Sequence, residues 1–307
     1  MKQRILRRII QVLGVILPNA YFTAWDGDPQ IYQGKLKGFI APILNCYACP
    51  SACVSCPAGS AQHFIALRSF PFFVVGLVGG LAMFLGRSFC GWLCPFGFLQ
   101  DMMYKLGRKL KLPHIRIPKW MDYGRYLFLI LFVIILPFMS SSVEVFEDPD
   151  TGEVFEFVEP GQTWFCKICP QGALEGGIPQ VLIHPELQDV IGRNFTMKMI
   201  ILGVFLLLFL ITKRPFCRVV CPVGAFLGLF NKVSLLHFEV DDHTCKSCDL
   251  CYTVCPVEHR IYESPNHPDC IRCGDCVSAC PWSAIHVTTI FKGSGKKQEI
   301  KLNEQSQ

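Results

Sequence analysis

Residues 245–256 read CKSCDLCYTVCP and residues 270–281 read CIRCGDCVSACP, so the spacing C-x-x-C-x-x-C-x-x-x-C-P occurs twice in close succession. Three cysteines of such a loop surround one 4Fe-4S cluster, whereas the fourth reaches a neighbouring cluster. Zinc sites use two cysteine pairs with a long spacer, so zinc is the less favoured occupant. The pattern predicts two clusters, one held by Cys245, Cys248, Cys251 and Cys280 and the other by Cys270, Cys273, Cys276 and Cys255.

A second cysteine pattern also occurs twice, as CGWLCPFG at residues 90–97 and as CRVVCPVG at residues 217–224. Neither pair can complete a four-thiolate site alone, but a pseudo-twofold axis along the membrane normal would bring the two pairs together. Four sulfur ligands suit either a 4Fe-4S cluster or zinc. Because cluster motifs follow in the same chain, we predict one more 4Fe-4S cluster, held by Cys90, Cys94, Cys217 and Cys221.

The composition indicates a membrane protein. Hydrophobic residues make up 51% of the 307 residues, and the mean hydropathy is +0.36, which exceeds the usual soluble composition. Four apolar stretches approach the ~20 residues that span a bilayer: Ile9 to Trp25, Ser69 to Gly86, Tyr123 to Ser142 and Met197 to Ile211. Buried core helices are the alternative, and Lys2 to Ala20 also fits a signal peptide.

These patterns together predict an α-helical integral membrane protein. We expect four transmembrane helices, arranged as two pseudo-repeated pairs, and a C-terminal α+β domain of the bacterial two-cluster ferredoxin type. The predicted boundaries are residues 1–237 for the membrane domain, 238–290 for the ferredoxin domain and 291–307 for a disordered polar tail.

The distribution of charge predicts the orientation. Basic residues precede the first apolar stretch, separate the second from the third and follow the fourth. The segment from Val143 to Asn194 is instead acidic, with Glu144, Glu147, Asp148, Asp150, Glu153, Glu156 and Glu159. Lys and Arg are retained on the cytoplasmic side, so both termini and the ferredoxin domain are expected there. The net charge of +5 follows from these flanks, which argues against nucleic acid as a partner.

Six more cysteines precede the second and fourth apolar stretches: Cys46, Cys49, Cys53, Cys56, Cys166 and Cys169. Residues 53–59 (CVSCPAG) and 166–172 (CKICPQG) repeat the pattern C-x-x-C-P-x-G. We call Cys90/Cys94 and Cys217/Cys221 the inner pairs and these six residues the outer cysteines. By analogy with the inner pairs, Cys53, Cys56, Cys166 and Cys169 are candidates for a fourth cluster, and Cys46 and Cys49 are a third pair or alternative ligands. Disulfides are the open alternative, because an outward compartment is oxidising. Sites on opposite faces of the ~30 Å hydrocarbon core would be too far apart for one efficient electron hop.

The paired C-x-x-x-C-P motifs and the two later cluster motifs, with Glu258 and His259 after the first, resemble the NapH/NosR/CcoG-type membrane polyferredoxins. The resemblance covers most of the chain and is closest to the NapH-like quinol dehydrogenase membrane components. It implies a bacterial inner membrane protein with cytoplasmic clusters. Such a protein passes electrons between the quinone pool or cytoplasmic donors and an outward-facing redox partner.

On this interpretation the chain is a non-catalytic subunit of an oxidoreductase complex, and its partners are other membrane or periplasmic redox subunits and quinone. The alternative is an accessory or assembly factor that reduces a metal or a disulfide of a client respiratory enzyme. The sequence contains no dinucleotide or phosphate-binding glycine motif, and no catalytic residue is predicted.

Overall fold

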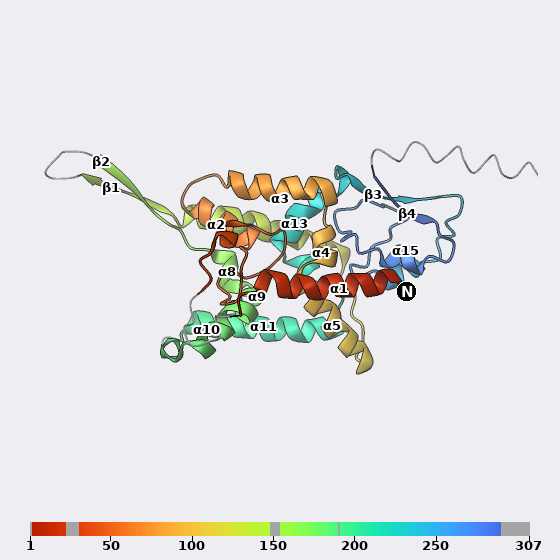
Figure 1. Ribbon diagram of the computed structural model, residues 1–307, viewed down its shortest axis with the longest axis horizontal. Helices are drawn as coiled ribbons and strands as arrows, with labels where there is room; N and C mark the ends of the chain where they lie inside the picture. The colour runs from red at the N-terminus through yellow and green to blue at the C-terminus, as the bar shows by residue number, and fades with distance from the viewer. Residues whose placement is uncertain (1, 23–30, 148–153, 190, 290–307) are drawn as a thin grey trace, which may run out of the picture.

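The structure is a computed structural model that describes residues 2–22, 31–147, 154–189 and 191–289. Figure 1 shows an elongated molecule in which three helices run along the long axis, with a β-hairpin at one end and the C-terminal strands at the other. These helices are α1 (Lys2–Ile16), α3 (Phe72–Leu85) and α11 (Arg193–Ile211), and the hairpin is formed by β1 (Ser142–Glu147) and β2 (Val154–Glu159).

Two segments are long and apolar enough to cross a membrane by length and composition, Lys119–Met139 and α11. The first is composite, because a π-helical turn interrupts it just before Pro137. Proline has no N–H to bond the carbonyl one turn earlier, and a π-bulge accommodates the defect. Helix α3 is apolar but has only 14 residues. The segment comprises η4 (Lys119–Tyr123), α6 (Gly124–Phe128), η5 (Leu129–Ile135) and α7 (Leu136–Met139).

The first helix lies earlier in the chain than predicted. The stretch expected from Ile9 to Trp25 is instead α1, which has 15 residues and ends at Ile16 before the turn η1 (Leu17–Asn19). Pro18 cannot continue the helix, because it lacks an N–H. At ~1.5 Å per residue α1 reaches about 22 Å, which is less than the ~30 Å hydrocarbon core.

Four helices begin in the same way, with a cysteine at the N-cap and a proline at the first helical position. Proline suits this position, because the first N–H groups of a helix have no intrahelical partner. Short helices carry a further cysteine ahead of three of these starts. The four are α2 (Pro57–Ala66), α5 (Pro95–Lys109), α9 (Pro170–Gly172) and α13 (Pro222–Leu229), and the short helices are α4 (Ser88–Trp92), α8 (Trp164–Ile168) and α12 (Pro215–Val219).

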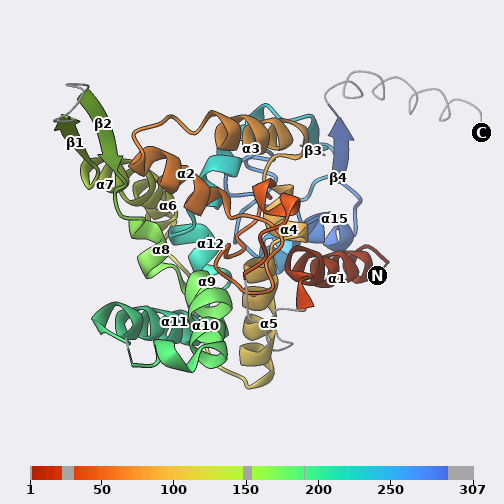
Figure 2. The ribbon, with the colours of Figure 1, turned by 60° about the vertical axis from the view of Figure 1, so that its left-hand side comes forward.

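Aromatic side chains fill the core between these helix starts. The Phe96 ring lies 4.9 Å from the Phe216 ring and 5.5 Å from the Phe209 ring, measured between centroids. Helix α5 packs against α11, and both lie in the lower part of the molecule in Figure 2. The approach is so close that a Cβ at Gly107 would clash with the carbonyl oxygen of Leu210. The apolar core therefore holds the repeated helix starts against one another.

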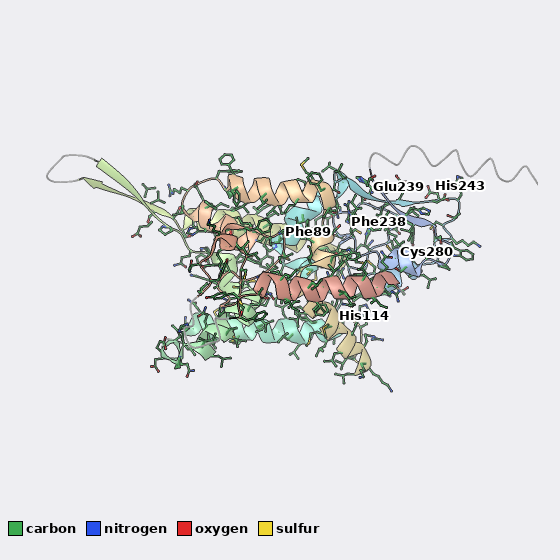
Figure 3. The ribbon with its side chains drawn as sticks, viewed as in Figure 1. Phe89, His114, Phe238, Glu239, His243 and Cys280 are labelled. Carbon is green, nitrogen blue, oxygen red and sulfur yellow. The ribbon has the colours of Figure 1, made fainter. Side chains whose placement is uncertain are left out.

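The C-terminal segment is a small α+β unit. Strand β3 (Leu236–Val240) pairs antiparallel with β4 (Ile285–Thr289), and α14 (Leu250–Val254) and α15 (Asp275–Ala279) lie between them in the chain. Phe238 packs with Ile261 and Ile285, and Figure 3 labels Phe238 and Cys280 in this unit. Left-handed φ values at Ser247, Asp249, Arg272 and Gly274 fold the two cysteine loops tightly.

The remaining elements are η3 (Lys35–Gly38), η6 (Ala173–Gly177), α10 (Ile178–Ile183), η7 (Pro185–Leu187) and η8 (Phe230–Lys232). Three acidic residues of the predicted outer segment, Asp148, Asp150 and Glu153, lie outside the described residues, as does the predicted tail 291–307.

Buried ion pairs attach the C-terminal unit to the helices. Arg218 of α12 places Nη1 2.6 Å from Glu258 Oε2 and Nε 3.0 Å from Asp122 Oδ1. His114, labelled in Figure 3, places Nε2 2.7 Å from the other oxygen of Glu258. Arg125 also pairs with Asp269. Because these side chains are largely buried, the attachment depends on complete charge pairing.

Replacing Arg218 with alanine should therefore destabilise the protein by about 3–5 kcal/mol, since the buried carboxylates of Asp122 and Glu258 would lose the guanidinium and Glu258 would retain its contact with His114. The matched control is Arg260→Ala, because the Arg260 guanidinium also contacts two carboxylates, Asp249 and Glu263, but at the surface. Thermal unfolding in detergent should show a large loss for the first variant and little change for the second. If both variants lost the same thermal stability, the ion pairs of Arg218 would not be what attaches the C-terminal unit to the helices.

Candidate iron-sulfur sites

The cysteines of the C-terminal unit line two cavities. Cys245, Cys248, Cys251 and Cys280 line the first, and Cys255, Cys270, Cys273 and Cys276 line the second, in which Cys251 also takes part. These are the two sets that the crossed spacing predicts, with the fourth cysteine of each loop lying at the other cavity.

The inner pairs come from equivalent halves of the chain. Cys90 and Cys94 lie at α4 and the start of α5, and Cys217 and Cys221 lie at α12 and the start of α13. All four are buried. Burial, and then the charges of Cys217 and Cys90, raise the pKa of the Cys94 thiol to about 12. The structure thus brings the two predicted pairs together.

Two buried arginines connect the halves reciprocally. Arg87 of the first half donates from Nη2 to the carbonyl oxygen of Cys217 at 2.6 Å, and Arg214 of the second half donates from Nη1 to that of Cys90 at 2.7 Å. Arg214 also forms a bidentate pair with Asp101, with both distances 2.7 Å. The exchange gives the site the pseudo-twofold symmetry that the repeated motif predicts.

The inner site fits an iron-sulfur cluster. Because burial raises the pKa of the Cys94 thiol, a metal centre that supplies positive charge would favour its thiolate form. Among the described residues the buried Nε of Arg87 has no hydrogen-bond partner, so the site holds a free cationic donor. A 4Fe-4S cluster with four thiolates is anionic and accepts hydrogen bonds at sulfur. Within the described segments, no three His, Cys, Asp or Glu side chains are close enough to hold a single metal ion.

A glutamine that the sequence analysis did not single out also serves this site. Gln100 Nε2 lies 3.0 Å from the sulfur of Cys217 and 3.2 Å from the carbonyl oxygen of Phe96. The equivalent residue of the second half is Leu227, so this donor has no symmetry mate. A sequence pattern could have identified Gln100, because C-P-x-G-x-x-Q occurs at residues 94–100 and again at residues 56–62.

Among the six outer cysteines, Cys46 lies near Cys56, Cys166 and Cys169. Burial, and then the charges of Cys166, Cys56 and Cys46, raise the pKa of the Cys169 thiol well above its ordinary value. Cys53, expected as the fourth member, instead has its sulfur 3.8 Å from the carbonyl oxygen of Ser51. Cys46 takes the place beside the other three because its loop turns toward η6. The structure contains no disulfide among its cysteines, all of which are described.

The inner site adjoins the second cavity of the C-terminal unit. Arg87 Nη1 donates to the carbonyl oxygens of Pro268 and Asp269, at 3.1 and 3.3 Å, immediately before Cys270. A Cβ at Gly91, the neighbour of Cys90, would lie 3.5 Å from the Cβ of Cys273. The two cysteine sets are therefore in contact through backbone and one arginine.

An apolar cavity of about 500 Å³ lies among the helices. It touches the helix starts behind two cysteines, through Pro57 and Ala58 after Cys56, and through Pro222 and Val223 after Cys221. Arg68 and Ser69 supply polar groups to its lining, and valines of α3 and η5 supply much of the rest.

Comparisons with known proteins agree with this chemistry. A 4Fe-4S binding domain family matches residues 69–113, 161–180 and 194–240, and a 4Fe-4S dicluster domain family matches residues 237–281. The chain is 32% identical over 218 residues to an uncharacterized protein of Methanocaldococcus jannaschii, a match that covers 69% of this chain and 76% of that protein. No solved structure matches the chain.

Two characterised relatives are ferredoxin-type or regulatory proteins. The ferredoxin-type protein NapH of Haemophilus influenzae is 26% identical, and the match covers 94% of this chain and 91% of NapH. The regulatory protein NosR of Stutzerimonas stutzeri is 28% identical, with 62% of this chain and 23% of NosR covered. The residues matched by the two 4Fe-4S domain families include both inner cysteine pairs and all eight cysteines of the C-terminal unit.

If the inner pairs share one cluster, Cys94→Ser and Cys221→Ser should each remove the same electron paramagnetic resonance signal, because neither pair completes a cubane alone. Cys248→Ser is the control, since it lies in the first C-terminal cavity and should remove a different signal. Loss of two distinct signals from the first two variants would exclude a shared site.

Removing the hydrogen bond of Gln100 should lower the reduction potential of the inner cluster. The reduced cluster is more negative and gains more from a donor at sulfur, so Gln100→Leu, which copies Leu227 of the other half, should act by tens of millivolts. About 1 kcal/mol of lost hydrogen bonding corresponds to roughly 40 mV for one electron. A redox titration of the full-length protein would measure it, with the C-terminal signals as the internal control. An unchanged inner potential would show that Gln100 does not act on the cluster.

Proposed function

Because this chain belongs to the NapH/NosR-type family of ferredoxin-type proteins with 4Fe-4S binding domains, we propose that it is a membrane electron-transfer subunit that exchanges electrons with a lipid-soluble quinone. Iron-sulfur electron transfer follows from the family itself. The number of clusters, the quinone and the partners belong to the proposal.

The observation that carries the quinone is the apolar cavity beside the cysteines. Its volume of about 500 Å³ and its nearly continuous apolar lining suit a flat ring with a hydrocarbon tail. Pro222 and Val223 line the cavity and directly follow Cys221, a proposed ligand of the inner cluster. A quinone ring in the cavity would therefore lie beside the residues that adjoin this ligand. Arg68 and Ser69 are the polar residues that would lie nearest the ring oxygens, and Arg68 is held by hydrogen bonds from Nε and Nη2 to Ser141.

The inner cluster would be the acceptor nearest the cavity. A quinol that becomes a quinone releases two electrons and two protons, whereas each 4Fe-4S cluster takes up one electron. Three clusters, one held by the inner cysteines and two by the C-terminal cysteines, can together accept both electrons. In the opposite direction, the same sites deliver two electrons to a quinone that takes two protons.

We place the C-terminal unit in the cytoplasm and the β1–β2 end outside, in a bacterial inner membrane, because the basic flanks favour that orientation. A redox subunit on the outer side is the expected partner. On this arrangement α1 and α3 also cross or enter the membrane beside the two longer segments.

The assembly-factor alternative requires thiols that a client protein can reach. Of the six outer cysteines, Cys49, Cys53 and Cys169 are buried and the others are only partly exposed. Thiol exchange needs an accessible thiolate. Burial therefore favours a resident redox group over exchange with a client.

A substitution that fills the cavity should slow electron exchange with quinone. We would purify full-length Ala61→Phe anaerobically, reduce it, remove the reductant and follow cluster oxidation after adding decylubiquinone. Ala61 lines the cavity, so the rate should fall at least tenfold, on the order of 1.4 kcal/mol or more. Dithionite should still reduce all the clusters.

The matched control is Gly76→Phe, on the same side of the bundle but outside the lining, where a new Cβ meets no atom within 4 Å. It should react as the unmodified protein does. If Ala61→Phe reacts equally fast, or if quinone oxidises no cluster in the unmodified protein, the quinone proposal fails while the iron-sulfur assignment stands.

A further inference from the structure

We propose that Cys46, Cys56, Cys166 and Cys169 hold a fourth iron-sulfur cluster on the outer side of the helices. Their side chains are placed around two glycine turns. A Cβ at Gly59 would lie 3.6 Å from the Cys166 sulfur and 3.9 Å from Cys56 Cβ, and one at Gly172 would lie 3.7 Å from the Cys46 sulfur. Cys169 is the N-cap of the helix that contains Gly172. Cysteines from three separate loops therefore lie at the same pair of turns.

The outer site repeats the structural unit of the inner site. Gln62, six residues after Cys56, donates from Nε2 to the carbonyl oxygen of Ala58 at 3.1 Å and to the Cys166 sulfur at 3.5 Å. Gln100, six residues after Cys94, makes the same two contacts with Phe96 and Cys217. A glutamine that bonds its own helix start and the sulfur of the opposite half marks both sites.

The outer cysteines also repeat the helix-start position of the inner ones. The first N–H groups of a helix have no intrahelical acceptor, so an anionic sulfur there is stabilised. The start of α13 shows such a contact, because the Gly224 N–H donates to the Cys221 sulfur at 3.4 Å. Cys56 and Cys169 occupy the equivalent N-cap positions of α2 and α9.

Cys46 completes the outer set because of its loop. Its N–H donates to Glu175 Oε2 at 2.9 Å, and its sulfur lies 3.1 Å from the Cβ position of Gly176, both in η6. Sequence spacing favoured Cys53, which stands where Cys90 stands at the inner site. The loop instead carries Cys53 toward Ser51. The spacing of the cysteines alone therefore does not identify Cys46 as the fourth proposed ligand.

Cations surround the outer site. Lys198 of α11 places Nζ 3.5 Å from the Cβ position of Gly172, beside the Cys46 sulfur. Lys37 donates to the carbonyl oxygens of Tyr47 and Ala52, at 2.6 and 2.8 Å, which holds its charge among the outer cysteines. A four-thiolate cluster is anionic, and these two ammonium groups suit it.

A cluster at the outer site would adjoin the inner one. Phe165 precedes Cys166 and Phe216 precedes Cys217, and the two rings have centroids 6.5 Å apart. Two side chains in contact separate the cysteine sets, which are therefore much closer than the ~30 Å thickness expected for sites on opposite faces. The outer cluster would extend the series of redox sites away from the C-terminal unit.

The test uses the full-length protein purified without oxygen. Four clusters predict about sixteen irons per chain. Cys46→Ser and Cys166→Ser should each lose about four irons and one resonance signal, while the other signals persist and show that the variants fold. Cys53→Ser is the matched control and should keep all its iron.

A second measurement needs no variant. The unmodified protein is unfolded in an alkylating reagent without reductant, and labelled cysteines are identified by mass spectrometry. A cluster leaves Cys46, Cys56, Cys166 and Cys169 as thiols, all labelled, whereas disulfides would leave them unlabelled. Disulfides, about one zinc per chain in place of four irons, or loss of iron from Cys53→Ser but not from Cys46→Ser, would each overturn the proposal.

Discussion

The reciprocal contact of two buried arginines with the opposite cysteine loops is the constraint on which the rest of the molecule depends. Arg87 and Arg214 are almost completely buried, and each donates to the carbonyl oxygen of the first cysteine in the other half. A guanidinium in an apolar interior is costly unless its donors are satisfied and its charge is balanced. Asp101 balances Arg214 directly. Arg87 keeps one free donor at the cysteines, so an anionic cluster there would complete the balance and the fold would depend on its cofactor.

The same local device is used at two depths of the molecule. A cysteine occupies the N-cap of a helix, proline follows at the first helical position, and a glutamine six residues after the cysteine bonds a sulfur of the other half. These positions follow from the chemistry of a helix start. The first N–H groups of a helix have no intrahelical acceptor, and proline has no N–H that would be left unpaired there. Repetition explains how one short sequence pattern organises both sites, with the aromatic core around Phe96 and Phe216 between them.

Sequence alone could predict the sites whose ligands are close together in the chain. The two C-terminal cavities have the membership that local spacing gives, since a tight loop fixes where three neighbouring sulfurs point. It could not point to Cys46 as the proposed fourth ligand of the outer site, because the position of Cys46 depends on a contact with Glu175, far away in sequence. It also placed the first helix too late, since apolar residues such as Leu17 continue past the point where Pro18 ends α1. The amide of Gln100 was overlooked for a similar reason: a single polar residue has no periodicity to reveal it.

The arrangement of the sites sets how electrons can move. Cys251 lines both C-terminal cavities, Gly91 brings the inner loop against Cys273, and Phe165 meets Phe216 on the far side of the inner site. Neighbouring sites in the described residues are therefore joined by packed contacts. Arg87 contributes to two of these junctions, because it bonds Cys217 on one side and Pro268 and Asp269 on the other. Such rigidity favours fixed distances over a swinging ferredoxin domain, and the buried pair of Arg218 with Glu258 acts in the same sense. If the proposed series of clusters is present, electron exchange with a diffusing partner would take place at the ends of that series or at the apolar cavity beside its middle.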